Sequence, residues 1–347
     1  MIIKELEKIV QDEKEKGQIA PFIQNALKEH LQIYVLYFIY THPEHMKNLI
    51  FTGGTCLRHF FGLERLSEDI DFDYLELIDP EALAKETKAF FAARYKYPDL
   101  QTSIKQKGGQ ILLKFPVLSK LGLLYRDRSD ILLVKIDLSP NPSRRFTTNT
   151  TSKSVHGFNF AARHYDLPCL MAGKLHAVLM REYRKGKENK ESVKGRDFFD
   201  LLWFVKMGAR PNIERLSQML GETRSFPLPE IEKRIDAKVE DFVTKHKSAF
   251  ISDLEPLIRN REVLPSYIAN YKDEYLRYKH NSFSPSVVLF IKCLRCKKDF
   301  SAGISMSKSN FDNLEMVRNE HLCPFCGSVN EIHNKNEYLI KSPEEMV

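Results

Sequence analysis

Three aspartates stand at alternate positions in EDIDFDYLEL, residues 68–77, where acidic and apolar residues take turns. This alternation is typical of a β-strand with one buried face, and residues two apart in a strand point to the same side. Asp69 and Asp71 therefore share a face, which Asp73 can join. Neighbouring carboxylates repel unless a cation lies between them, and Mg²⁺ is held by one or two carboxylates plus substrate phosphates. The pattern predicts a divalent-cation site; the alternative is an exposed strand face with no function.

A further carboxylate stands in DILLVKIDLSP, residues 130–140, a segment that is apolar on both faces except for Lys135 and Asp137. This composition predicts a buried strand. If it neighbours the first strand, Asp137 completes a set of three carboxylates suited to metal-assisted phosphoryl transfer. We expect Asp73 to be a bystander on the same face.

A glycine turn precedes the alternating acids. The sequence LIFTGGTCLRHFF, residues 49–61, predicts a short strand that ends at Gly53 and Gly54 and then a short helix. Glycines let the backbone approach a bound group, and a helix N-terminus offers free N–H donors, so the turn suits the phosphates of a nucleoside triphosphate. The hydroxyl of Thr55 can add a hydrogen bond. The alternative is an ordinary strand-to-helix turn, but a turn followed by paired acids favours a nucleotide site.

Four of the six cysteines form two pairs near the C-terminus, Cys293 with Cys296 and Cys323 with Cys326, and 26 residues separate the pairs. This spacing predicts a four-cysteine zinc ribbon whose Zn²⁺ is structural, because no open coordination position remains. His321 is an alternative ligand. Residues 281–347 hold eight Lys/Arg and eight Asp/Glu. This balance leaves nucleic-acid binding, protein contact and a purely structural role open for the ribbon.

The formal net charge of +7 lies entirely in residues 1–280 and is densest in residues 181–196, with seven basic and three acidic side chains. A basic surface suits an anionic partner such as a nucleotide or RNA. A solvated lysine-rich loop is the alternative for this run.

The chain of 347 residues has 43% hydrophobic and 29% charged residues, which is ordinary for a globular protein. It contains no apolar run of eighteen residues, and its N-terminus is charged from the fourth residue without the apolar core of a signal peptide. We therefore expect no membrane span and a cytoplasmic protein.

The remaining pattern predicts an α+β fold followed by a helical half. Residues 20–41, 80–95, 167–186, 196–208, 229–252 and 264–279 have helical character, and residues 102–118 read as a hairpin with a turn at Gly108 and Gly109. The polar stretch HNSFSPSV, residues 280–287, marks a domain boundary.

The stretch GGTCLRHFFGLERLSEDIDF, residues 53–72, resembles motif I of the AbiEii/AbiGii-type nucleotidyltransferases. These are toxins of AbiE-like toxin–antitoxin and phage-defence systems within the DNA polymerase β-like nucleotidyltransferase superfamily. The chain has the glycine turn, the spacer and the D-x-D pair of the superfamily, and its Arg65, Ser67, Asp69 and Asp71 match the branch-specific run. The resemblance extends from about residue 25 to about residue 210.

Three later segments continue the resemblance: KID at 135–137, the helical Lys174 in AGKLHAVLMREY, and KGRDFFDL at 194–201. The resemblance implies that Mg²⁺ and the attacking hydroxyl are served by Asp69, Asp71 and Asp137. It implies that the nucleotide contacts Gly53, Gly54, Thr55, Ser67, Lys135, Lys174, Arg196 and Asp197. For Asp200, a structural salt bridge is an equal alternative.

The resemblance also implies the architecture. A polymerase β-like core, a mixed sheet flanked by helices, would occupy residues 1–165, and a helical domain completing the nucleotide site would occupy residues 166–280. The zinc ribbon would occupy residues 286–336, and residues 337–347 would form a tail.

The function implied is transfer of a nucleoside monophosphate from a nucleoside triphosphate (NTP) to an acceptor, with pyrophosphate released. By resemblance the acceptor is an RNA 3′ end, tRNA in particular, and a cognate antitoxin is a partner. The alternatives are transfer to a protein hydroxyl and a non-catalytic module that binds NTP or RNA. A degenerate site should have lost a carboxylate, whereas all three remain, which favours an enzyme.

Overall fold

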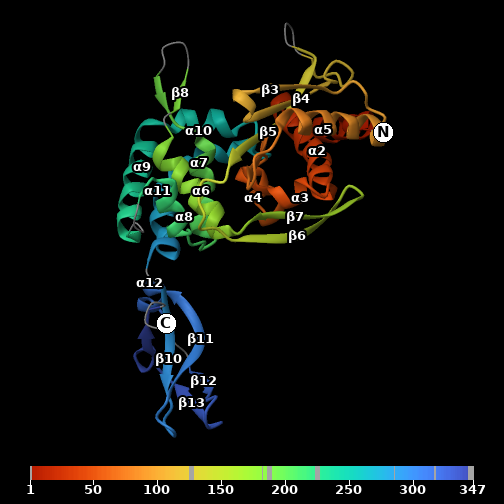
Figure 1. Ribbon diagram of the computed structural model, residues 1–347. Helices are drawn as coiled ribbons and strands as arrows, with labels where there is room; N and C mark the ends of the chain where they lie inside the picture. The colour runs from red at the N-terminus through yellow and green to blue at the C-terminus, as the bar shows by residue number, and fades with distance from the viewer. Residues whose placement is uncertain are drawn as a thin grey trace.

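A computed structural model of the chain describes residues 2–124, 129–181, 183–185, 190–222, 227–284, 286–315 and 318–342. Within these residues a seven-stranded sheet with its helices is followed by a helical half, and a small β domain lies at the C-terminal end (Figure 1). The architecture is α+β, with a mixed sheet flanked by helices, as the sequence predicted. Within the described residues, no helix is both long and apolar enough to cross a membrane.

The large sheet is mixed, in the order β3-β4-β5-β2-β1-β7-β6. Strand β2 runs parallel to β5, β1 runs parallel to β7, and the other neighbours are antiparallel. The strands are β1 (Leu49–Thr52), β2 (Asp69–Tyr74), β3 (Gln101–Lys105), β4 (Gln110–Pro116), β5 (Ile131–Pro140), β6 (Thr148–Val155) and β7 (Phe158–Tyr165). The parallel pairing of β2 and β5 brings the two acidic strands side by side.

One face of this sheet is covered by apolar helices. Helix α2 (Ala20–Thr41) is buried on nearly all sides because it lies between α1 (Ile2–Glu15) and the sheet. Its Tyr40 ring packs edge-on against Phe72 of β2, with 6.3 Å between centroids. Helix α5 (Pro80–Tyr95) packs beside it on β3 and β4. The apolar residues of β2 therefore face α2, and its aspartates face the opposite side.

The helical half covers the acidic side of the sheet. It consists of α6 (Leu167–Met180), α7 (Gly195–Lys206), α8 (Ile213–Met219), α9 (Leu228–Lys245), α10 (Lys247–Leu254) and α11 (Leu264–Phe283). A single hydrophobic core runs from Ile2 to Phe283 through both halves. The boundary proposed at residue 165 therefore marks a change from sheet to helices within one core.

Some elements differ from the sequence-based prediction. The helix expected to reach residue 186 ends at Met180, and Tyr183–Lys185 forms β8, which pairs with β9 (Lys190–Ser192). The helix stops because the backbone is extended at Arg181. The guanidinium of Arg181 forms an ion pair with Asp197. The segment 229–252 is divided into two helices at His246, and the hairpin of β6 and β7 was not predicted at all.

The C-terminal domain has its own small core, which includes Val287, Leu289, Phe300 and Tyr338. Its strands are β10 (Ser286–Lys292), β11 (Asp299–Ser307), β12 (Asn319–Leu322), β13 (Val329–Ile332) and β14 (Leu339–Lys341), with α12 (Lys308–Asp312) between β11 and β12. Strand β14 pairs with β10, so the first residues of the predicted tail belong to the sheet. Residues 343–347 of that tail lie outside the described residues.

The four cysteines of the two CxxC turns form one cluster. The Sγ atoms of Cys293 and Cys326 lie 3.6 Å apart, and those of Cys296 and Cys323 lie 3.7 Å apart. Tetrahedral Zn²⁺ with bonds of about 2.3 Å separates its sulfur ligands by about 3.8 Å, so the cluster fits this ion. His321 lies outside the cluster and shares a hydrogen bond with the hydroxyl of Tyr338.

We predict that removing zinc unfolds the C-terminal domain alone. The small domain core gains much of its stability from such a metal, whereas the core of residues 2–283 does not depend on it. A zinc-selective chelator, added in excess Mg²⁺, should abolish hydrogen-exchange protection in residues 286–341 and leave NTP binding within about twofold. Adding back Zn²⁺ should restore protection. Loss of NTP binding together with the protection would contradict the division.

Candidate functional site

The three predicted carboxylates come together on the face of the sheet opposite α2. The register of β2 and β5 places Asp71 beside Asp137 and Asp69 beside Lys135. The three carboxylates line a cavity of about 300 Å³, within the size range of small-molecule sites. The other lining residues come from the turn after β1, from β2, and from α6, α7 and the segments beside them: Thr52, Gly53, Gly54, Leu57, Arg65, Ser67, Phe72, Asp73, Ser139, Leu170, Gly173, Lys174, Ala177, Arg181, Lys194, Arg196 and Asp197.

The glycine turn fits tightly against these acids. Gly53 has φ +76°, and a Cβ atom there would lie 2.0 Å from Oδ2 of Asp71. A Cβ atom on Gly54 would lie 2.6 Å from Nη2 of Arg65 and 3.1 Å from Oγ of Ser67. Helix α4 (Gly53–Phe61) begins at this turn without a side-chain cap. Its first backbone N–H groups are therefore available to a bound anion at the edge of the cavity.

Thr55 does not have the role that the sequence suggested. Its side chain is buried, it does not line the cavity, and its hydroxyl donates to the backbone carbonyl of Asp69. This bond ties the first turn of α4 to the start of β2. The residue fixes the distance between the glycine turn and the acids, and Thr52 is the threonine that lines the cavity.

Mutual repulsion makes the acids hard to ionise together. Burial, followed by the neighbouring charges of Asp137 and Asp69, raises the pKa of Asp71 to about 7. Burial also raises the pKa of Asp137, against the hydrogen bond that Nε2 of Gln110 donates to its Oδ1 at 2.6 Å. A bound cation would remove the repulsion and lower both pKa values.

The donor set fits Mg²⁺. All the side-chain donors are carboxylate oxygens, which this ion prefers. The carboxylate oxygens of Asp69, Asp71 and Asp137 are not all within 4.8 Å of one another. The three side chains alone therefore do not form a complete coordination shell. This spacing suits Mg²⁺ held by one or two carboxylates and completed by substrate phosphates.

A buried network of ion pairs forms the opposite side of the cavity. Lys174 on α6 lies 2.8 Å from a carboxylate oxygen of Asp197 and 2.8 Å from one of Asp200, both on α7. Arg65 donates to both oxygens of Asp200 at 2.6 Å, and both side chains are buried. Burial opposes ionisation of Asp197, but Lys174 and Arg181 outweigh it and lower its pKa to about 2. The network thus holds Lys174 charged and fixed at the cavity wall.

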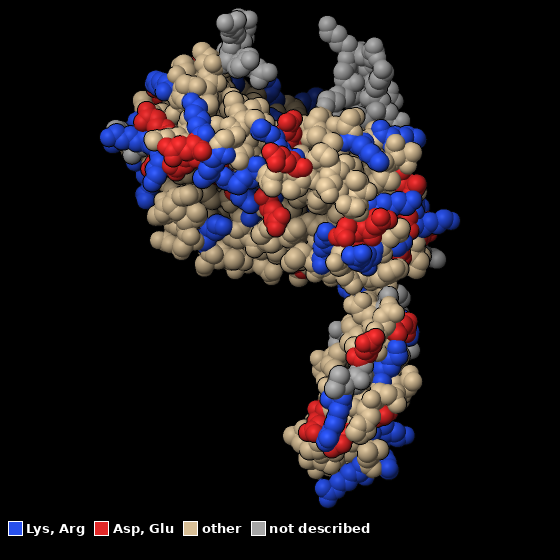
Figure 2. Space-filling model, turned by 180° about the vertical axis from the view of Figure 1, so that it is seen from behind, with Lys and Arg blue, Asp and Glu red and all other residues tan. Residues whose placement is uncertain are grey.

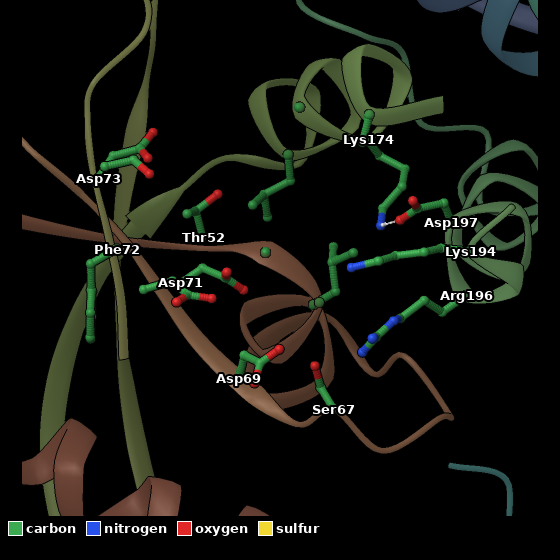
Figure 3. Close-up of a pocket in the computed structure, with 18 of the residues that line it drawn as sticks. Thr52, Ser67, Asp69, Asp71, Phe72, Asp73, Lys174, Lys194, Arg196 and Asp197 are labelled. Atoms are coloured by element: carbon green, nitrogen blue, oxygen red, sulfur yellow. Dashed lines mark hydrogen bonds and ion pairs between the residues drawn. The ribbon is translucent and has the colours of Figure 1, made fainter. Parts of the chain in front are cut away.

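Two further cations reach the cavity from the start of α7, Lys194 at its N-cap and Arg196 in its first turn. Figure 3 shows Lys194 and Arg196 extending toward the space opposite Asp69 and Asp71. Arg196 donates to Oε2 of Glu68 at 3.0 Å. Burial and the nearby Arg181 and Arg196 lower the pKa of Lys194. The cavity therefore has an acidic wall on the sheet and a basic wall on the helices.

Most of the predicted site residues meet at this cavity. The lining includes Gly53, Gly54, Ser67, Asp69, Asp71, Asp137, Lys174, Arg196 and Asp197. Besides Thr55, Lys135 is the exception: it lies outside the lining, with Nζ 3.2 Å from Oδ1 of Asp69. Asp200 has the structural role that was weighed for it. Asp73 lines the cavity edge and is buried beside Tyr165, whose hydroxyl donates to it at 2.7 Å.

Sequence reasoning missed Thr52, Arg181 and Lys194 as cavity residues. Arg181 and Lys194 stand at the two ends of the basic run 181–196, which was interpreted as a surface for RNA. Their positions could have indicated the cavity, because Arg181 directly follows α6 and Lys194 directly precedes α7. The side chains of residues 182–192 in the middle of the run lie outside the described residues.

The cavity joins a phosphate-type turn, paired carboxylates and a wall of fixed cations on a mixed sheet, and this combination defines a nucleotidyltransferase. The family model described as nucleotidyl transferase AbiEii toxin, type IV toxin–antitoxin system, matches residues 35–276. The chain belongs to this family. It is therefore a nucleotidyltransferase of the toxin class, and the family implies an NTP substrate and a cognate antitoxin.

Two solved structures from Helicobacter pylori are similar to this chain. One, a candidate nucleotidyltransferase, has 18% identity, a TM-score of 0.41, and coverage of 74% of this chain and 96% of its own. The other, JHP933, has 17% identity, a TM-score of 0.39, and coverage of 74% and 95%. Both similarities are too weak to carry structural detail over to this chain. No curated protein matches the chain.

We predict that divalent-cation affinity falls at low pH. Because the pKa of Asp71 is about 7, its carboxyl is protonated below that pH and must lose a proton before it binds a cation. Isothermal titration with Mn²⁺ should give an affinity about tenfold weaker at pH 6 than at pH 8. In Asp71→Asn this pH dependence should disappear. Equal affinity of the unaltered chain at both pH values would contradict the assignment.

We predict that Gly53→Ala damages the site more than the fold. The three atoms nearest to the new Cβ all belong to the Asp71 side chain, so the carboxylate must move. Gly62→Ala is the matched control, because Gly62 has φ +79° and nothing within 4 Å. Both should lose about 1–2 kcal/mol of stability in thermal unfolding. Titration with each NTP in Mg²⁺ should show at least about tenfold weaker binding for Gly53→Ala alone. Equal NTP affinities would refute the close fit.

Proposed function

We propose that this nucleotidyltransferase moves a nucleoside monophosphate from an NTP to the 3′ end of an RNA, with tRNA as the foremost acceptor, in a Mg²⁺-dependent reaction. The observation that carries the proposal is the pairing of Asp71 with Asp137 opposite fixed cations. An acidic wall that binds cations and a basic wall that binds phosphate are what a triphosphate with its metal requires.

The triphosphate would lie between the two walls. The N–H groups at the start of α4 and the charges of Lys174, Lys194 and Arg196 would bind its oxygens. Asp69, Asp71 and Asp137 would hold Mg²⁺, which supplies Lewis-acid stabilisation of the charge that develops on the phosphates. Asp197 and Asp200 would keep Lys174 in place through their ion pairs with it, and Arg65 would in turn hold Asp200.

The transfer itself needs one displacement at phosphorus. The acceptor hydroxyl oxygen attacks the α-phosphorus and forms a new P–O bond. The bond from that phosphorus to the bridging oxygen of the β-phosphate breaks, and pyrophosphate leaves with the electron pair. One of the three carboxylates of the acidic wall would accept the proton of the acceptor hydroxyl as the new P–O bond forms.

The family supports the toxin role, and RNA as acceptor rests on the basic character of residues 1–280. Transfer to a protein hydroxyl uses the same chemistry and is the second candidate.

We predict that α-labelled NTPs, incubated with the protein and total RNA, place label on RNA in Mg²⁺. Asp69→Asn plus Asp71→Asn should reduce transfer at least about a hundredfold, because the acidic wall no longer holds the cation. Glu7→Gln plus Glu15→Gln, which removes the same charge from the exposed side of α1, should leave transfer unchanged. Label on protein instead of RNA would refute the RNA acceptor, and no transfer to either would refute the proposed reaction.

A further inference from the structure

The end of the C-terminal domain that carries the two CxxC turns concentrates positive charge. We call residues 292–298 and 322–329 the knuckle end. Lys292, Arg295, Lys297 and Lys298 are all exposed there, and they are half of the eight basic residues of 281–347. No acid occurs between Lys292 and Lys298. Blue atoms gather at the lower tip of this domain in Figure 2.

These four cations differ from most other basic residues of the domain. Within the described residues none of the four is in an ion pair, whereas Lys308, Arg318 and Lys341 each are. Several of the domain's acids are therefore partnered away from the knuckle end. Arg318 lies 3.1 Å from Glu320 and 2.6 Å from Glu331, and Lys341 lies 3.7 Å from Asp299. The even charge balance of the domain therefore hides a positive end.

The same end exposes large apolar side chains. Leu294 is 71% exposed and Phe325 is 56% exposed, one on each CxxC turn. Leu322 and Val329, cross-strand partners at the base of the second turn, are 67% and 58% exposed. Apolar groups left in water at this density mark an interaction surface.

The two turns form one surface. Sulfur atoms from the two turns lie 3.6 Å and 3.7 Å apart, and the backbone N–H of Leu294 donates to Oδ1 of Asn330 at 2.9 Å. The Nζ atom of Lys298, on the first turn, lies 5.0 Å from the ring centroid of Phe325 on the second. A cation and an aromatic ring from different turns are thus held side by side.

We propose that the knuckle end is a docking surface for single-stranded RNA. Phe325 and Leu294 would contact unstacked bases, and the four free cations would contact the phosphates. Exposed aromatic rings among unpaired Lys and Arg are the features that bind single strands without sequence preference. A duplex would hide its bases from the ring. The choice of RNA over DNA rests on the proposed function, whereas the surface itself is independent of the cavity residues.

This surface lies at the far end of the C-terminal domain from the helical half (Figure 1). RNA held there would be retained on the protein without using the transfer site. The role of the domain would be to raise the local concentration of acceptor.

The test is fluorescence anisotropy of a labelled single-stranded 12-nucleotide RNA with the full-length zinc-loaded protein. Arg295→Gln plus Lys297→Gln plus Lys298→Gln should bind at least about tenfold more weakly, and the slope of log affinity against log salt should fall by about two. The matched control removes the same charge from the rest of the domain: Lys308→Gln plus Lys335→Gln plus Lys341→Gln should stay within about twofold of the unaltered chain.

Phe325→Ala should weaken binding by roughly fivefold to a hundredfold, the loss of one stacked base, and Phe325→Tyr should restore it. Zinc content and thermal unfolding of all variants should match the unaltered chain. Equal RNA affinity and salt slope for the two triple variants would overturn the proposal. Tighter binding of a labelled single-stranded DNA 12-mer than of the RNA would overturn RNA as the ligand.

One further variant separates this proposal from the proposed function. Asp71→Asn should lose transfer and keep RNA affinity, because the knuckle end does not involve the cavity. If RNA binds at the knuckle end and no NTP is ever transferred, the proposed reaction fails and the docking surface stands. If transfer occurs and the triple Gln variant binds RNA unchanged, the docking surface fails and the reaction stands.

Discussion

The candidate site is organised around two carboxylates that repel each other, Asp71 and Asp137, on neighbouring parallel strands. Both carboxylates are half-buried, and burial together with neighbouring like charge raises both pKa values. A cation bound between them would remove this repulsion. The turn at Gly53 lies so close to the Asp71 carboxylate that only a residue without a Cβ atom fits between them. The energetic cost of this arrangement is offset when a cation and phosphates arrive together.

On the basic wall, a positive charge has to be stabilised away from water. Lys174 is buried among apolar residues of α6, where an unpaired charge would be costly. Burial alone would lower the pKa of Lys174. The neighbouring negative charges of Asp197 and Asp200 outweigh this effect, so the pKa is raised. Because Arg65 binds Asp200 and also lies against Gly54, the basic wall and the glycine turn share one network.

Sequence patterns were sufficient where chemistry and periodicity coincide. Alternation placed Asp69 and Asp71 on one face, and the glycine turn, the third acid and the basic helices were found from motifs. The orientation of the other side chains depends on helix phase and on packing, which the sequence pattern does not determine. Thr55 looks like a phosphate ligand because it follows two glycines, yet the helix phase turns it inward onto the carbonyl of Asp69. Lys194 looks like part of a surface run, and only the packing of α7 against α6 brings it to the cavity. Strand β6 of the unpredicted hairpin lies in polar sequence without clear alternation, and most of its residues are exposed.

The C-terminal domain illustrates why net charge is a poor guide to a small fold. Eight basic and eight acidic residues suggest a neutral surface. A β domain of this size has few interior positions, so nearly all its charges lie outside, and their effect depends on which ones meet. Here the acids meet Arg318 and Lys341 on the strands, and the cations beside the cysteines are left without partners. The same turns that bring the four Sγ atoms together leave Leu294 and Phe325 exposed. Charge and apolar surface therefore coincide at one end as a consequence of the cysteine cluster.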